Sequence, residues 1–417
     1  MAAPAPPLTV PGDKSIAHRA VILAALARGE SRLRNVPAGL DVRSTQRAAR
    51  ALGIEIREDG DALVVRGGGG ALTAPGTPID CGNSGTTIRL LAGALATRAI
   101  TVTLDGDASL RARPMRRVAA PLAAFGAELT LTSAGTAPFV LRGNGEAQGA
   151  AVEIGVPSAQ IKSSVLLAAL NAHGRTTLTG RLDTRDHTER LFRAFGVACT
   201  VEDGTILIDG PQTPAACDFD VPGDVSSAAF LLAAAAAVPG ARAVVDDVGL
   251  NPTRTAVFDV LRRFGAEVAV DPGAFGAEPR GRVTVSGARL RAIVIDPGEV
   301  PGLIDELPLV GVLGAFAEGT TVVTGAAELR VKESDRIETF ARAARALGVE
   351  VETFDDGFAV HGPARWRGGT VETRGDHRIA MAFAVAARAA GIEVRLDDPD
   401  CVAVSFPGFA GALERVA

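Results

Sequence analysis

A glycine recurs along the chain at the junction between a helical stretch and a following strand. Each time an aromatic residue or leucine precedes it and an apolar residue follows; the instances are Leu52-Gly53-Ile54, Phe125-Gly126-Ala127, Phe195-Gly196-Val197, Phe264-Gly265-Ala266 and Leu347-Gly348-Val349. The glycines are 73, 70, 69 and 83 residues apart, a spacing that a high alanine content does not explain. Such a glycine ends a helix through a left-handed residue. We therefore expect six units of about 70 residues in the 417-residue chain.

The other half of the unit is a turn followed by a helix of small apolar residues. Three clear and three weaker copies begin at Val10, Val156, Val221, Asn83, Asp305 and Gly375. Helices that alternate with strands predict an α/β fold of pseudo-symmetric design. Because the alanine-rich helices are apolar on most faces, we expect them to be buried, with the arginine-containing helices and the sheets around them.

Composition excludes several classes of function. The net charge is −5 and aromatic residues make up 4% of the chain, so neither a global basic field nor a stacking platform for nucleic acid is expected. Any anion must bind at a local cluster of cations. The four cysteines are far apart and no histidine lies at ligand spacing, so we expect no metal site, no disulfide framework and a cytoplasmic location. The apolar run at residues 228–238 is too short to span a membrane.

Polar residues stand at the start of each small-residue helix, where free N–H groups favour anions. Lys14, Ser15 and Arg19 form one cluster, in which Ser15 is either a phosphate ligand or a helix cap. Residues 83–87 with Arg89 repeat the arrangement, and a plain capped turn is the alternative in both places. Residues 12–15 lack the glycines of a nucleotide-binding P-loop, so that motif is rejected.

Four further segments concentrate charge near apolar helices. Of the four arginines at residues 111–117, we expect at most one to bind a ligand. Residues 332–336 are expected at the start of a helix, with Lys332 and Arg336 on one face and Glu333 in position to pair with Arg336. A solvent-facing set of salt bridges is the simpler interpretation. Asp376-His377-Arg378 stand at the start of a helix that we expect to be buried. Burying charged groups there costs free energy unless they have a binding role. Asp305 is either a proton acceptor or a helix cap.

Taken together, these clusters resemble the 5-enolpyruvylshikimate-3-phosphate synthases, a family of enolpyruvyltransferases, over essentially the full chain. The matching segments are residues 12–19, 82–89, 111–114, 157–160, 305–306, 329–336 and 375–378. The resemblance implies a two-lobed inside-out α/β barrel of six βαβαββ units with buried helices and outer sheets. One lobe would be residues 12–222, on the shikimate 3-phosphate side. The other would be residues 1–11 plus 223–417, with the catalytic carboxylates and the phosphoenolpyruvate arginines.

The resemblance also implies an activity, the transfer of the enolpyruvyl group of phosphoenolpyruvate to the 5-hydroxyl of shikimate 3-phosphate with release of phosphate. Shikimate 3-phosphate would contact Lys14, Ser15, Arg19, Ser158, Ala159, Gln160, Arg185, Asp305 and Lys332. Phosphoenolpyruvate would contact Lys14, Gly85, Arg113, Gln160, Arg336 and Arg378. The catalytic residues would be Asp305, which takes the hydroxyl proton, together with Glu333 and Lys14. No metal or organic cofactor, glyphosate as an inhibitor and a monomeric state are expected.

Two positions depart from the family pattern: Val404 stands where many members have lysine, and Glu328 where some have asparagine. Three other functions are less consistent with the sequence. An enolpyruvyltransferase acting on a UDP-sugar would carry a loop cysteine, which residues 111–117 lack. An RNA-terminal phosphate cyclase would have a basic RNA-binding face. A non-catalytic shikimate-binding protein would not need both Asp305 and Glu333.

Overall fold

The computed structural model describes residues 6–273 and 276–416, and it divides into two compact units. We call residues 12–221 the inserted unit; residues 6–11 and 222–416 form the terminal unit. The second crossing falls between Val221 and Pro222, one residue before the expected boundary. Residues 1–5 and 417, also expected in the second lobe, lie outside the described residues.

The inserted unit alternates helices and short strands. Its helices are α1 (Lys14–Leu26), α2 (Leu40–Ala51), α3 (Gly85–Ala96), α4 (Ala108–Arg111), α5 (Arg116–Ala123), α6 (Ala159–Ala169) and α7 (His187–Ala194). Its strands are β1 (Arg28–Arg34), β2 (Glu55–Asp59), β3 (Ala62–Gly68), β4 (Ile79–Asp80), β5 (Thr101–Asp105), β6 (Glu128–Thr130), β7 (Phe139–Arg142), β8 (Ala151–Ile154), β9 (Gly174–Gly180), β10 (Thr200–Glu202), β11 (Thr205–Gly210) and β12 (Phe219–Asp220).

These strands form three sheets of one topology, with orders β12-β1-β3-β2, β4-β5-β7-β6 and β8-β9-β11-β10. In each sheet the first pair is parallel and the other two pairs are antiparallel. The edge strand of the first sheet, β12, comes from the end of the unit, so the last residues of the unit complete its first sheet.

The terminal unit follows the same plan with one exception. Its helices are α8 (Val225–Ala236), α9 (Ala256–Phe264), α10 (Val300–Leu303), α11 (Leu307–Phe316), α12 (Arg336–Ala346), α13 (His377–Ala390) and α14 (Phe409–Glu414), with 3₁₀ helices η1 (Ala327–Val331) and η2 (Pro399–Val404). Its strands are β13 (Arg242–Gly249), β14 (Glu267–Pro272), β15 (Arg280–Ser286), β16 (Val294–Ile295), β17 (Gly319–Val323), β18 (Glu350–Phe354), β19 (Gly357–Gly362), β20 (Gly369–Val371) and β21 (Val394–Leu396).

The sheets of the terminal unit are β13-β15-β14, β16-β17-β19-β18 and β20-β21. Leu8 pairs in parallel with Val245 of β13, so the start of the chain supplies the edge that β12 supplies in the inserted unit. In the last sheet η2 and α14 follow β21, where the repeat predicts another helix and a hairpin. The sixth βαβαββ unit is therefore incomplete in the described residues.

The repeated glycines end helices as the sequence predicts. All have positive φ angles, which only glycine adopts without strain; the angles are +88° at Gly53, +79° at Gly126, +69° at Gly196, +114° at Gly265 and +88° at Gly348. Gly391, with a φ of +64°, ends α13 in the same way. The helix ends expected at these five glycines are confirmed.

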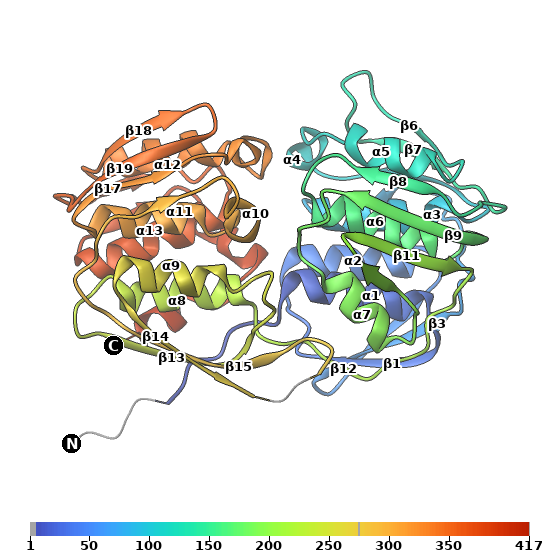
Figure 1. The fold of residues 1–417 in the computed structure, drawn as a ribbon, viewed down its shortest axis with the longest axis horizontal. Coiled ribbons are helices and arrows are strands. Elements are labelled where there is room, and N and C mark those ends of the chain that lie inside the picture. The colour runs from blue at the N-terminus through green and yellow to red at the C-terminus, as the bar shows by residue number, and fades with distance from the viewer. Residues whose placement is uncertain (1–5, 274–275, 417) are drawn as a thin grey trace. The chain divides into compact units, whose positions relative to one another are not determined.

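The small-residue helices are buried, as expected. Every residue of α8 is buried, and so are nearly all residues of α1, α3 and α11. Figure 1 shows α11 and α13 beneath β17 and β19 in the terminal unit. Among the described residues, no helix has both the length and the hydropathy that crossing a bilayer requires.

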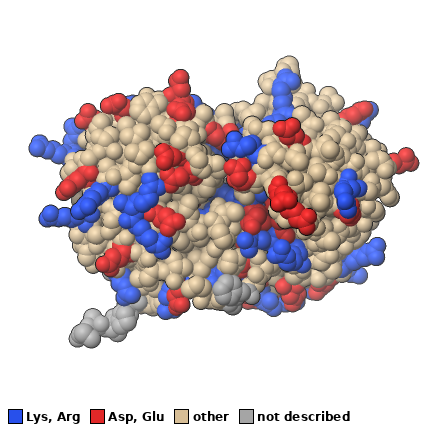
Figure 2. All heavy atoms as spheres, in the orientation of Figure 1, with Lys and Arg blue, Asp and Glu red and all other residues tan. Residues whose placement is uncertain are grey.

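Surface charges of both signs are interspersed on the face drawn in Figure 2. Many belong to exposed ion pairs, such as Arg175 with Asp209 and Arg111 with Asp105. Exposed pairs of this kind contribute little to stability. No extended basic field is visible on this face.

Helices α3 and α6 approach closely because small residues line their contact. A Cβ on Gly93 would lie 2.1 Å from the carbonyl oxygen of Ser164. The Ser164 hydroxyl donates to the carbonyl oxygen of Arg89 at 2.9 Å, and Thr97 donates to that of Ala168 at 2.9 Å. These contacts fix the relative position of the two helices that present Arg89 and Gln160.

We predict that Gly93→Ala destabilises the protein by about 1–3 kcal/mol, because the added methyl group would force α3 and α6 apart. Urea unfolding would measure the change. Gly411→Ala is the matched control, since its methyl group would meet nothing within 4 Å in α14. Equal stability of the two variants would contradict the close-packing account.

Candidate functional site

The N-terminus of α1 carries a buried arginine whose position is fixed by two other helices. Arg19 is 3% exposed. Its Nη2 donates to Ser163 of α6 at 2.7 Å, and its Nε donates to Thr188 of α7 at 2.9 Å. A third bond, 2.8 Å long, runs from Nη1 to the carbonyl oxygen of Ser15. The guanidinium therefore joins α1, α6 and α7.

Lys14 and Ser15 begin the same helix. The Lys14 ammonium lies 2.9 Å from the carboxylate of Asp41 on α2, a partner that sequence analysis did not identify. The cap is Asp13, whose carboxylate accepts from the Ile16 amide at 3.0 Å. The alternative that Ser15 caps the helix is wrong.

The N-termini of α3 and α6 are joined by a second buried arginine. Ser84 caps α3. Arg89 is 4% exposed and donates from Nη1 to Gln160 Oε1 at 2.6 Å. The amide nitrogen of Gln160 donates in turn to Thr86 Oγ1 at 3.0 Å. Gln160 thus has both polar atoms engaged with α3 before any ligand binds.

Gly85 leaves room for two guanidinium groups. A Cβ there would lie 2.8 Å from Arg89 Nη1 and 3.2 Å from Arg113 Nη1. Arg113 donates to Asn83 and, at 3.2 Å, to Ser109. Of the four arginines at residues 111–117, Arg113 alone is buried.

The remaining predicted residues of the inserted unit lie on α6 and on the loop before α7. Ser158 caps α6. The carbonyl oxygen of Ala159 accepts from the Ser163 hydroxyl at 2.6 Å. Arg185 is half-buried in the loop between β9 and α7. Lys14, Ser15, Arg19, Ser158, Ala159 and Gln160 are therefore grouped at linked helix ends, with Arg185 on an adjoining loop.

In the terminal unit, Arg336 is the centre of a carboxylate cluster. Its side chain is 1% exposed, and its nitrogens lie 2.8 Å from Asp376, 2.6 Å from Glu333 and 3.3 Å from Asp305. Burial opposes the charge, but the three carboxylates, Asp376 foremost, raise the pKa of the Arg336 guanidinium. The predicted ion pair of Glu333 with Arg336 is confirmed, whereas the solvent-facing interpretation of this segment is wrong.

Asp376 organises the start of α13. Its carboxylate accepts from the Arg378 amide at 3.0 Å and from the Ser334 hydroxyl at 3.0 Å. Asp376 is fully buried. The Asp376 side chain therefore caps one helix while it holds the guanidinium of another.

Asp305 faces two guanidinium groups. Besides its contact with Arg336, its carboxylate lies 3.7 Å from Arg378 Nε, and its carbonyl oxygen accepts from Arg378 at 3.1 Å. The residue before α11 is Glu306, and no side chain caps that helix. The alternative that Asp305 is a helix cap is therefore wrong.

Lys332 lies between η1 and α12, so the expectation that it shares a helix face with Arg336 is wrong. Burial lowers the pKa of its ammonium, and the nearby carboxylates of Asp305 and Glu328 oppose that shift. A negatively charged ligand would oppose this shift as the two carboxylates do.

A family model for EPSP synthase (3-phosphoshikimate 1-carboxyvinyltransferase) matches residues 6–413. The chain belongs to the EPSP synthase family. A 3-phosphoshikimate 1-carboxyvinyltransferase of Limosilactobacillus fermentum is 47% identical, over 98% of this chain and 96% of the relative. The protein catalyses the reaction of this family, the transfer of the enolpyruvyl group from phosphoenolpyruvate to shikimate 3-phosphate. It is therefore a transferase of the shikimate pathway.

Solved structures agree with this membership of the EPSP synthase family. An EPSP synthase of Acinetobacter baumannii has a TM-score of 0.86 and 38% identity, covering 99% of this chain and 95% of that one. The enolpyruvyl transferase NikO of Streptomyces tendae has a TM-score of 0.77 and 20% identity, covering 99% and 94%. The latter likeness concerns the mixed α/β fold alone.

Sequence analysis missed a second buried network in this EPSP synthase family member. Arg254 is 2% exposed and donates to the Ser226 hydroxyl at 2.6 Å. Ser226 donates to Glu306, and Asp224 lies 3.6 Å from Arg254. The only signal was Asp224 in the repeated turn; nothing near Arg254 in the sequence indicates burial.

His18 is part of a buried chain of hydrogen bonds that links three helices. Its Nδ1 lies 2.6 Å from Thr45 Oγ1, which lies 2.7 Å from Thr87 Oγ1, and Thr87 donates to Ser84 at 2.8 Å. This chain links α1, α2 and the cap of α3. Burial lowers the pKa of His18 from 6.5 to about 3.

The buried imidazole makes acid destabilising. Between pH 6.5 and about 3 the unfolded chain binds a proton at His18 that the native protein does not, so stability falls as pH falls. We predict that His18→Asn, which keeps a polar atom near the Nδ1 position, makes the decline shallower by about 1.4 kcal/mol per pH unit. Urea unfolding across this range would measure it. The exposed His173→Asn is the control, and parallel curves for the parent and His18→Asn would refute the assignment.

Proposed function

We propose that the buried cations of the two units bind the two anionic substrates and that carboxylates beside them move the protons. The observation that supports this most is the grouping of the family-motif residues at linked helix N-termini, with guanidinium groups held by internal partners. Both substrates carry phosphate and carboxylate groups, for which helix N-termini and arginines are suited.

For shikimate 3-phosphate, the proposed contacts in the inserted unit are Lys14, Ser15, Arg19, Ser158, Ala159, Gln160 and Arg185. Hydrogen bonds to Ser163 and Thr188 already fix the Arg19 side chain, so Arg19 loses little conformational entropy when the substrate binds. In the terminal unit, Lys332 and Asp305 are proposed to contact the same substrate. An anion bound there would oppose the lowering of the Lys332 pKa by burial.

For phosphoenolpyruvate, the proposed contacts are Lys14, Gly85, Arg113, Gln160, Arg336 and Arg378. Gly85 is proposed to contribute by having no side chain, because a methyl group there would come close to the guanidinium groups of Arg89 and Arg113. Arg336 and Arg378 are fixed by Asp376 and Glu306 as well as by Asp305. Fixed guanidinium groups stabilise negative charge without reorganising during the reaction.

The proposed chemistry has two steps. In the addition, Asp305 takes the proton of the 5-hydroxyl group of shikimate 3-phosphate. The oxygen of that hydroxyl group attacks C2 of phosphoenolpyruvate. Glu333 or Lys14 donates a proton to the methylene carbon, which gives a tetrahedral adduct. In the elimination, the new methyl group returns a proton, the bond from C2 to the phosphate oxygen breaks and phosphate leaves. No metal or organic cofactor takes part in these steps.

The finer architecture belongs to the same proposal. Each unit is an inside-out barrel, with helices in its interior and sheets outside; the complete burial of α8 supports this. The inserted unit is the shikimate 3-phosphate side, and the terminal unit holds the catalytic carboxylates and two of the phosphoenolpyruvate arginines. A monomer is sufficient, because one chain supplies every proposed contact. Glyphosate, also a small anion, is the proposed inhibitor at the phosphoenolpyruvate cations.

The first test is phosphate release from phosphoenolpyruvate with shikimate 3-phosphate, with UDP-N-acetylglucosamine as the comparison acceptor. We predict release with the first acceptor only. Asp305→Asn should lower kcat roughly 10²- to 10⁴-fold, because the attacking hydroxyl loses its proton acceptor. The exposed Asp61→Asn is the control. A kcat for Asp305→Asn equal to that of the control would refute the assigned role.

A second test concerns Gly85. We predict that Gly85→Ala raises the inhibition constant of glyphosate by at least about tenfold, and more than it raises the KM for phosphoenolpyruvate, because the inhibitor is the larger molecule. Gly76→Ala, where a methyl group would meet nothing within 4 Å, is the control. Equal inhibition of the Gly85→Ala variant and its parent would contradict the proposal.

A further inference from the structure

Lys162 of α6 is a buried lysine that the proposed mechanism does not use. Its side chain is 2% exposed, and its ammonium lies 2.7 Å from the carboxylate of Glu189 on α7. It also donates to the carbonyl oxygens of Leu182 at 3.3 Å and Thr184 at 3.2 Å. These three acceptors match the three donors of a lysine ammonium.

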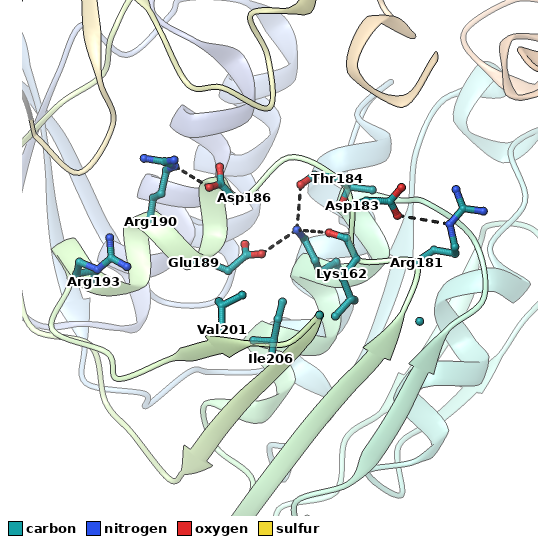
Figure 3. Close-up of a pocket in the computed structure, with 13 residues that line it drawn as sticks. Lys162, Arg181, Asp183, Thr184, Asp186, Glu189, Arg190, Arg193, Val201 and Ile206 are labelled. Carbon is teal, nitrogen blue, oxygen red and sulfur yellow. Dashed lines mark hydrogen bonds and ion pairs between the residues drawn. The ribbon is translucent and has the colours of Figure 1, made fainter. Parts of the chain in front are cut away.

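Two of these acceptors belong to the loop at residues 181–186, between β9 and α7. Residues of this loop line a cavity of about 680 Å³, which Lys162, Glu189, Val201 and Ile206 also line. Figure 3 shows the Lys162 ammonium directed toward Thr184 and Glu189. Backbone bonds join Arg181 N to Ile154 O and Thr184 N to Leu182 O, both at 2.7 Å. The bonds from Lys162 add a connection between the loop and α6.

The bond to Thr184 acts on the neighbouring residue. The Thr184 carbonyl group belongs to the peptide unit that joins Thr184 to Arg185, and this unit is planar. Fixing its oxygen therefore fixes the nitrogen of Arg185 and limits the direction in which the Arg185 side chain leaves the backbone. Lys162 begins the turn of α6 that follows Ser158 and Gln160, so the same helix that presents those residues holds the loop.

We propose that Lys162 is a positioning residue for shikimate 3-phosphate: the Lys162–Glu189 pair holds the 181–186 loop so that Arg185 is oriented for the ligand. This inference rests on the proposed function, in which Arg185 contacts that substrate. Glu189 compensates the buried charge, and the two loop carbonyl groups receive the remaining donors.

The test replaces the ion pair by apolar residues of similar size. Lys162→Met alone would leave Glu189 buried without its cation and destabilise the protein. The double variant Lys162→Met/Glu189→Leu removes both charges, a change that is often neutral for stability. We predict that it unfolds near the parent's urea midpoint, keeps the parent's kcat and KM for phosphoenolpyruvate, and raises the KM for shikimate 3-phosphate on the order of tenfold. The exposed pair variant Arg175→Met/Asp209→Leu is the matched control and should leave both KM values unchanged.

Combining Arg185→Ala with the double variant tests whether Lys162 acts through Arg185. If Lys162 acts through Arg185, adding Arg185→Ala to the double variant raises the KM for shikimate 3-phosphate no further than Arg185→Ala does alone. Additive effects, a parallel change in both KM values, or an unchanged KM in the double variant would overturn the inference. If Arg185→Ala itself leaves the KM for shikimate 3-phosphate unchanged, the role proposed for Arg185 fails and the inference fails with it.

Discussion

A buried cation must find its partners inside the protein, because removing a guanidinium from water without them is very costly. Arg19, Arg89 and Arg336 meet this requirement in different ways. Arg19 and Arg89 donate to hydroxyl, amide and carbonyl groups of neighbouring helices, whereas Arg336 is surrounded by three carboxylates. In each case at least one partner comes from a distant part of the chain, so separate segments must be brought together accurately before the cations can be buried.

The small residues of the chain make that accuracy possible. Gly93 lets α3 approach the backbone of α6, and Gly85 lets two guanidinium groups share one region. An alanine-rich helix such as α8 can be buried on every side because its side chains need little space. Aromatic residues make up 4% of the chain, so close contact between backbones replaces large interlocking side chains over much of the core.

Local patterns in the sequence predicted the features that depend on neighbouring residues. The left-handed glycines, such as Gly53 and Gly348, depend on the backbone alone, and the buried helices follow from their composition. Patterns did not predict partners across long separations: Arg19 meets Ser163 and Thr188, which are 144 and 169 residues away. Asp13 and Ser15 are both residue types that cap helices, and only the backbone geometry shows that Asp13 caps α1. The sixth repeat diverges after β21. No further glycine of the series follows there to end a helix before a hairpin.

The central claim is that cations held by internal partners receive the substrate without rearranging. A crystal structure of the protein with shikimate 3-phosphate bound would test it most directly. The account predicts that the ligand lies within hydrogen-bond distance of Arg19, Ser158 and Gln160, and that Arg19 keeps its bonds to Ser163 and Thr188. A ligand bound away from these residues, or an Arg19 side chain that leaves both hydroxyl groups to reach it, would contradict the account.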